Sequence, residues 1–295
     1  MMVKKDKGFQ IFLHIIMVIL GVTVVFPLLL LFMSSITPEA EIMRSGYSLW
    51  PDKFDFSAYI YIFKDGSVFR SYLITIVVTV VGTFAGLIIT MLVSYTLTVP
   101  HLPGKKILSF YILFTMLFSG GLIPSYMMWT NIFHIKNTIW ALIFPNLLCN
   151  AFHVMIARSY FQNNIPSEIL ESARIDGLSE YKIFTKIVAP LSVPIMATIG
   201  FMQALMYWND WTNSLYYITE KRLVGIQALL NNMLTNIQYL AQSMTSMGSA
   251  SDTLSVPTLG MRMAIAVVGM LPMLLLYPFF QKYYTKGLLV GAVKG

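Results

Sequence analysis

Residues 11–33 read IFLHIIMVILGVTVVFPLLLLFM, a stretch of 23 residues without aspartate, glutamate, lysine or arginine. The hydrocarbon core of a bilayer requires about 20 apolar residues in helical form, so this stretch is long enough to cross a membrane. Lysines at positions 4, 5 and 7 precede it, as they would in a secretory signal peptide. The run is longer than the apolar part of such a signal and ends without a small-residue cleavage site, so we expect an uncleaved first membrane helix.

The rest of the chain repeats this pattern. Of its 295 residues, 57% are apolar and only 11% charged, whereas a soluble domain has about a quarter charged residues. Five more segments are long and apolar enough for a membrane helix, at residues 72–97, 107–129, 138–157, 191–211 and 263–280. We therefore expect an all-α polytopic membrane helix bundle with six transmembrane helices, formed by residues 1–295 as a single domain.

The basic residues set the expected orientation. An even number of helices places both termini on one side, and cytoplasmic loops carry an excess of lysine and arginine. With both termini in the cytoplasm, twelve of the 20 basic residues fall inside and eight outside. These flanking residues also explain the net charge of +7, and no basic stripe with interleaved aromatic residues indicates nucleic-acid binding.

Two expected outer segments, residues 34–71 and 212–262, are long. Within the second, residues 225–237 carry apolar side chains at helical spacing, which predicts an amphipathic helix on the bundle or in the membrane interface. Residues 242–255 are rich in serine, threonine, methionine and glycine, which is typical of a loop.

The expected cytoplasmic loop at residues 161–190 is the most informative segment, and positions 164–190 read NIPSEILESARIDGLSEYKIFTKIVAP. Pro166 is a helix-start signal, Gly177 ends this first helix with positive φ, and a second helix begins near Ser179. Both helices have an apolar face, formed by Ile169, Leu170 and Ala173 in the first and by Tyr181, Phe184 and Ile187 in the second. Because acidic and basic residues are mixed here, we expect the loop to contact another protein rather than only anionic lipid.

This loop resembles the EAA signature of permease subunits from binding-protein-dependent ABC importers. That signature is Glu-Ala-Ala, three residues, Gly, nine residues, Ile, one residue and Leu-Pro. The residues in register are Glu171, Ala173, Asp176, Gly177, Ile187 and Pro190. The departures, Ser172 and Ala189, are small or apolar. The run GGLIP at 120–124, the Trp208-Asn209 pair and the ending KGLLVGAVKG at 286–295 resemble the carbohydrate-uptake, maltose-type group of these permeases.

The resemblance implies a function. The permease core would cover residues 71–281, and the six residues in register would contact the ATPase. The chain would move an oligosaccharide or glycan fragment by alternating access into a bacterial cytoplasm across the plasma membrane. An extracellular solute-binding lipoprotein would deliver this sugar. A second permease subunit would lie beside this chain in the lipid bilayer, and an ATPase dimer would bind on the cytoplasmic side.

We expect no enzyme activity and no cofactor on this chain. Residues 102–106, LPGKK, are too short for a phosphate-binding loop and lack its hydroxyl residue, so ATP and Mg would be held by the partner ATPase. Cys149 is the only cysteine, which excludes a disulfide within the chain, and no cysteine–histidine cluster has metal-site spacing.

Polar residues within the expected spans are candidates for the substrate pathway. They are Gln203, Tyr207, Trp208, Asn209 and Trp211 in the fifth segment, and Asn146 and Asn150 in the fourth. The helical spacing of Gln203, Tyr207 and Trp211 would place them in a stripe on one helix face, and that of Asn146, Asn150 and His153 would do the same. Sugars bind through amide hydrogen bonds and stacking on aromatic rings. Hydrogen bonding between helices is the simpler alternative for the same residues.

Other functions stay open at this point. An ABC permease for a peptide, a polyamine or another non-sugar solute would have the same loop. An ion-coupled secondary transporter would need an acidic residue within a span, and Asp210, at a span end, is the only candidate. A membrane enzyme would need a catalytic pair on one helix face, and the sequence has none.

Overall fold

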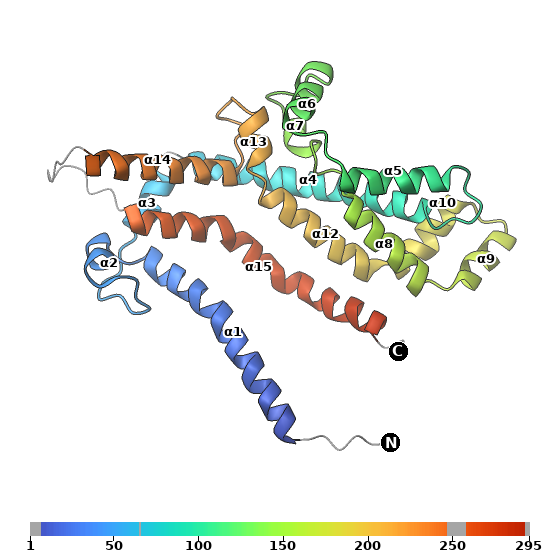
Figure 1. Cartoon of the computed structure of the whole chain (residues 1–295), viewed down its shortest axis with the longest axis horizontal. Coiled ribbons are helices and arrows are strands. Elements are labelled where there is room, and N and C mark those ends of the chain that lie inside the picture. Colours follow the sequence, from blue (N-terminus) through green and yellow to red (C-terminus); the bar gives the residue numbers. More distant parts are fainter. Residues whose placement is uncertain (1–6, 65, 247–257, 293–295) are drawn as a thin grey trace. The chain divides into compact units, whose positions relative to one another are not determined.

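The computed structural model describes residues 7–64, 66–246 and 258–292. These residues form helices and connecting turns without a β-strand, so the predicted all-α class is confirmed for them (Figure 1). Two compact units can be distinguished. One comprises residues 1–68 and 232–271, and the other comprises residues 69–231 and 272–295.

Three described helices are long and apolar enough to cross a membrane: α1 (Lys7–Ser35), α4 (Ser67–Thr96) and α15 (Thr258–Ala292). Two pairs of shorter helices pass the same test only when each pair is counted as one bent span. The described residues thus provide three to five candidate spans. A multi-pass helical membrane protein is supported, whereas the predicted number of six spans is not confirmed.

The span predicted at 107–129 is interrupted. Helix α5 (Lys105–Leu117) is followed by α6 (Leu122–Met127) and the π-helix η1 (Met128–Ile132), and the two parts meet at an angle of 115°. Gly121 lies at the bend with φ +84°, a backbone conformation that is strained for any residue with a Cβ atom. The chain leaves α5 at Phe118, which is extended, and enters α6 directly after Gly121, where apolar composition alone predicts a continuous helix.

The span predicted at 138–157 is not one helix either. The structure has a short α7 (Trp140–Ile143), an irregular stretch, and then α8 (Ala151–Asn164). Asn146 adopts φ +61° in that stretch, and the side chain of Asn150 caps α8 by accepting hydrogen bonds from two backbone amides of its first turn. The expectation that Asn146, Asn150 and His153 share one face of a continuous helix is wrong for this reason.

The fifth predicted span is shorter than expected and bent at its start. The second part of the predicted loop at 161–190 consists of α10 (Glu180–Ile183), the π-helix η2 (Phe184–Val188) and α11 (Ala189–Leu191). After Ser192 the chain turns by 83° into α12 (Val193–Trp208). Prolines at positions 190 and 194 flank this bend, and each lacks an amide hydrogen for a continuous helical ladder.

The unit that contains the N-terminus includes α1, α2 (Glu39–Ser45) and α3 (Ser57–Phe63). The Glu39 carboxylate accepts hydrogen bonds of 3.0 Å from the amides of Leu259 and Gly260, in the first turn of α15. An anion at a helix N-terminus satisfies orphan amides and interacts favourably with the helix dipole. One side chain from α2 therefore caps the first turn of α15.

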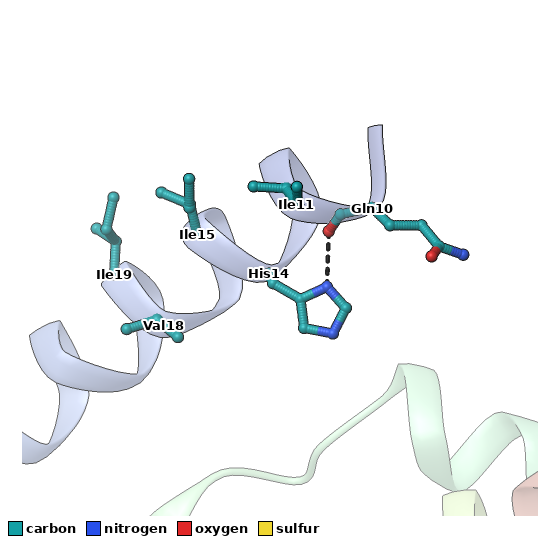
Figure 2. A pocket seen from close by; sticks show the side chains of 6 residues that line it. All are labelled: Gln10, Ile11, His14, Ile15, Val18 and Ile19. Atoms are coloured by element: carbon teal, nitrogen blue, oxygen red, sulfur yellow. Dashed lines mark hydrogen bonds between the residues drawn. The ribbon is translucent and has the colours of Figure 1, made fainter. Parts of the chain in front are cut away.

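Helix α1 presents apolar side chains around its circumference. Figure 2 shows Ile11, Ile15 and Ile19 successively along the helix, with the ring of His14 turned back towards the chain. The Nδ1 atom of His14 lies 2.6 Å from the Gln10 carbonyl oxygen. That bond satisfies one of the two ring nitrogens within the helix itself.

The amphipathic helix predicted at 225–237 is confirmed by α14 (Ile226–Ser246), after the short α13 (Thr212–Tyr217). Its buried residues include Ile226, Leu230 and Ile237. The first amide of α14 donates to the Thr75 hydroxyl over 2.8 Å, which ties this helix to α4. The loop predicted at 242–255 is wrong for residues 242–246, which belong to α14, and residues 247–255 lie outside the described part.

Candidate functional site

The predicted loop at 161–190 folds as two short helical parts, and Figure 1 shows α9 and α10 next to one another in the second unit. Helix α9 (Ser167–Ile175) begins directly after Pro166, as predicted. Gly177 follows it with φ +79°, so the predicted positive φ is confirmed. The amides of Gly177 and Leu178 return to the carbonyls of Arg174 and Ala173, each over 3.0 Å, which is a glycine-terminated helix end.

Each part of the loop has a buried and an exposed face. Ala173 and Ile183 are buried, and they pack in one cluster with Phe161 of α8 and Ile195 of α12. Tyr181, by contrast, is 72% exposed, and Ile183 is the buried residue of α10.

The exposed face of α9 combines apolar and acidic residues. Ile169 and Ile175 are 43% and 86% exposed, and Glu171 and Asp176 are exposed as well. Among the other residues in register with the signature, Ile187 is half-buried and Pro190 exposed. A short helix with large apolar side chains in solvent is the kind of surface that a partner protein covers.

An ion pair crosses the turn between the two parts of the loop. Arg174 Nε lies 2.7 Å from Glu180 Oε1, and the Tyr95 hydroxyl at the end of α4 donates to the other carboxylate oxygen. The hydrogen bond that Arg174 donates to Glu180 raises the pKa of the guanidinium above its ordinary value and lowers the pKa of the Glu180 carboxyl, so both groups favour their charged forms. Neither Tyr95 nor Glu180 is predicted as a site residue from the sequence, because they are 85 positions apart.

The two central polar residues of α12 are buried. The Gln203 amide donates to the Leu147 carbonyl over 2.6 Å and its oxygen lies 3.2 Å from His153 Nδ1. The Tyr207 hydroxyl donates to the Ile143 carbonyl over 2.9 Å. Both side chains thus satisfy backbone or ring atoms of the interrupted segment between α7 and α8, as buried polar groups must be satisfied.

The remaining candidates of the substrate pathway lie apart from this network. Trp208 is buried against Tyr72, with ring centroids 6.0 Å apart. Asn209 and Trp211 are exposed beyond the end of α12, so Trp211 does not continue the helical stripe of Gln203. The structure therefore brings the buried candidates to the packing interface of α12 and leaves two exposed ones at its end.

The candidates of the fourth segment are also separated. Asn146 is exposed in the irregular stretch, and Asn150 is occupied in capping α8. His153 faces Gln203 rather than a metal site. Among the residues that the structure describes, no group of three histidine, cysteine or acidic side chains is placed to hold a metal ion.

Comparison with known proteins places this architecture in a family. Residues 72–290 match the family described as binding-protein-dependent transport system inner membrane components. The chain is 36% identical over 291 residues to the polygalacturonan/rhamnogalacturonan transport system permease protein YtcP of Bacillus subtilis (strain 168), covering 99% of this chain and 100% of that protein. It is 31% identical to the arabinooligosaccharides transport system permease protein AraQ of Halalkalibacterium halodurans, over 92% of this chain and 91% of that one.

A solved structure agrees with these sequence relatives. A chain from a bacterial ABC transporter involved in the import of the acidic polysaccharide alginate superposes with a TM-score of 0.79 and 26% identity. The superposition covers 96% of this chain and 99% of that chain. Taken with the matched residues 72–290, these findings show that the chain belongs to the family of binding-protein-dependent transport system inner membrane components.

Proposed function

We propose that this chain is a permease subunit of an ABC importer and that α9 is the helix on which the ATPase acts. The observation that carries the proposal is the exposed face of α9, where Ile175 is 86% exposed next to Asp176 and Gly177. These residues coincide with the signature at Glu171, Ala173, Asp176, Gly177, Ile187 and Pro190. ATP binding and hydrolysis then belong to a separate subunit dimer, with ATP and Mg, because the sequence has no phosphate-binding loop.

The proposed assembly has a second permease subunit beside this one and an extracellular solute-binding lipoprotein that delivers the substrate. Residues 1–295 form the transmembrane domain, residues 71–281 its permease core and residues 161–190 the coupling loop. Six spans with both termini cytoplasmic agree with the bias of twelve inner to eight outer basic residues. Each bent pair of helices would then count as one span, and the interrupted 138–157 segment as the sixth.

The proposed substrate is an oligosaccharide that contains uronate residues. The relatives named for polygalacturonan and for alginate support an acidic sugar. Two lysines support an acidic sugar too. The side chain of Asn137 accepts hydrogen bonds from the backbone amides of Thr219 and Glu220, and it thereby joins the two short segments that carry Lys136 and Lys221. Lys136 Nζ lies 3.2 Å from the Tyr126 hydroxyl, and neither lysine contacts a carboxylate of the residues that the structure describes. Cations of this kind attract an anionic ligand.

For the pathway itself, we propose contacts by the residues at and beyond the end of α12. Trp211 and Asn209 offer an aromatic platform and an amide, the groups that bind sugars. Gln203, Tyr207 and Trp208 support the pathway by fixing α12, and Asn146 and Asn150 by shaping the interrupted segment. The exposed residues of this set would thus contact the sugar, and the others would hold the helix and the segment beside it in place.

Reconstitution of the complete importer in liposomes tests the function. Uptake of labelled oligogalacturonides should require ATP inside, the binding protein outside and this chain, and it should exceed uptake of arabino-oligosaccharides and of a peptide. Uptake that persists without the ATPase and collapses with an ionophore would instead show an ion-coupled secondary transporter. Preference for the peptide would contradict the sugar assignment while leaving the ABC assignment intact.

A further inference from the structure

Glu180 is bound by side chains from two other helices. It is the first residue of α10, and its Oε1 atom accepts the hydrogen bond of 2.7 Å from Arg174 in the last turn of α9. Its Oε2 atom accepts the hydrogen bond from the hydroxyl of Tyr95, in the last turn of α4. One carboxylate therefore joins both helical parts of the coupling loop to the C-terminal end of the long helix α4.

The packing around this carboxylate supports the same connection. Tyr95 is buried, and its ring centroid lies 5.4 Å from that of Phe184 in η2. Tyr95 also belongs to the buried cluster that contains Ala173 of α9 and Ile183 of α10. The end of α4 and the coupling loop are thus one packed body, in which the hydroxyl–carboxylate bond adds direction to contacts that are otherwise apolar.

Solvent exposure weakens the Arg174–Glu180 bond more than the Tyr95–Glu180 bond. The side chains of Arg174 and Glu180 are 26% and 43% exposed, so solvent screens their mutual attraction. The bond to Tyr95 is made by a buried residue of a different element, and a charged acceptor strengthens it. The ion pair orients the carboxylate across the Gly177 turn, and the tyrosine then binds the oriented oxygen.

We propose that Glu180 is a positioning residue for coupling, which ties α9 to the end of α4 so that both move as one body when the ATPase displaces α9. This inference rests on the proposed docking of the ATPase on α9. It goes further by naming the membrane helix that receives the movement and the side chains that transmit it. A coupled displacement of this kind needs packed elements that keep their mutual geometry between two states.

The functional test uses Tyr95→Phe, which removes the hydroxyl and keeps the ring. In the reconstituted importer, sugar uptake per ATP hydrolysed should fall about fivefold or more, the scale of a typical coupling between sites. Basal ATP hydrolysis and the yield of the assembled complex should not change. Glu180→Ala should have a similar effect, and the Tyr95→Phe/Glu180→Ala pair should be no worse than Glu180→Ala alone, because both changes break the same bond.

Tyr160→Phe is the matched control, since the Tyr160 hydroxyl in α8 reaches only the Leu191 carbonyl, at 3.3 Å. This variant should couple as the unmodified protein does. Equal uptake per ATP in Tyr95→Phe and Tyr160→Phe would overturn the proposal. If the unmodified complex itself shows no sugar-dependent uptake, the proposed function fails before the role of Glu180 is tested.

A second measurement does not depend on substrate. Spin labels at positions 175 and 92, attached after Ile175→Cys, Leu92→Cys and Cys149→Ser, would report the distance between α9 and α4. The side chains of Ile175 and Leu92 are exposed, and because Ile175 lies on the proposed docking face, the labelled complex must first hydrolyse ATP as the unlabelled one does. The distance should stay constant between nucleotide-free and ATP-bound complexes, and its distribution should broaden in Glu180→Ala. A change of about 2 Å or more with ATP in the otherwise unmodified protein, the scale of helix shifts in switching proteins, would refute a rigid connection.

Discussion

A Cβ atom placed on Gly82 would lie 2.3 Å from Cζ of Tyr207, so the tyrosine ring lies directly against the backbone of α4. One turn farther along α4, a Cβ atom on Gly86 would lie 2.4 Å from Nε2 of Gln203. Tyr207 donates a hydrogen bond to the Ile143 carbonyl, and Gln203 donates one to the Leu147 carbonyl. The two glycines therefore allow α12 to cross α4 closely enough to satisfy the interrupted segment, the role that small residues have between membrane helices.

Gly82→Ala should destabilise the protein by about 1–3 kcal/mol, because the methyl group overlaps an aromatic ring that is fixed by its own hydrogen bond. We expect the thermal midpoint of the purified complex to fall by about 3–10 °C. Gly200→Ala is the control, since its Cβ would meet only Leu87 Cδ2 at an ordinary 3.6 Å. Equal midpoints for the two alanine variants would contradict the close crossing.

Gly177→Leu should uncouple ATP hydrolysis from uptake without preventing membrane insertion. No atom lies within 4 Å of a Cβ atom placed on this glycine, so the cost comes from its φ of +79° rather than from crowding. A left-handed conformation costs a residue with a side chain about 1–2 kcal/mol, and asparagine tolerates it best. Uptake per ATP should therefore rank glycine above asparagine above leucine. A leucine variant with full uptake would show that the turn has no role in coupling.

Glu39→Ala should loosen the first turn of α15. Loss of the capping carboxylate is expected to cost about 1 kcal/mol, and the amides of Leu259 and Gly260 should exchange with deuterium about fivefold faster, the factor that this energy gives. Glu41→Ala is the control, because the Glu41 carboxylate accepts a hydrogen bond of 2.8 Å from the Asp52 amide and not from α15. That variant should leave the exchange at residues 259 and 260 unchanged, and equal acceleration in both would refute a specific cap.

The sequence predicts the helical class and the two ends of α9 well, because both depend on local patterns. The long apolar stretches give α1, α4 and α15, and the Pro166 and Gly177 signals give both ends of α9. A fixed spacing of residues in one loop can be read without knowledge of the rest of the fold.

The interruptions and the polar core could not be predicted in the same way. The apolar composition of residues 138–157 gives no sign that Asn146 has a positive φ and interrupts the helix. The Leu147 carbonyl in this interruption accepts its hydrogen bond from Gln203, in a distant part of the sequence. Gly82 and Gly86 are four positions apart, a spacing that small residues have where membrane helices cross closely. Only the structure shows which side chains lie across those glycines.

Substitutions of Trp211 and Tyr207 should distinguish a residue that contacts the sugar from one that packs between helices. Trp211 is 40% exposed beyond α12, whereas Tyr207 is 2% exposed and bound to the Ile143 carbonyl. Trp211→Ala should raise the half-saturating sugar concentration about tenfold, the loss of roughly one aromatic contact of 1.4 kcal/mol, and leave the thermal midpoint of the complex unchanged. Tyr207→Phe should instead lower stability by about 1 kcal/mol, since a buried acceptor loses its donor, at an unchanged half-saturating concentration. Both quantities can be measured on the same reconstituted preparations. If Tyr207→Phe weakens sugar binding as much as Trp211→Ala while stability is kept, then Tyr207 contacts the sugar in the transporting state, and its assignment to packing is wrong.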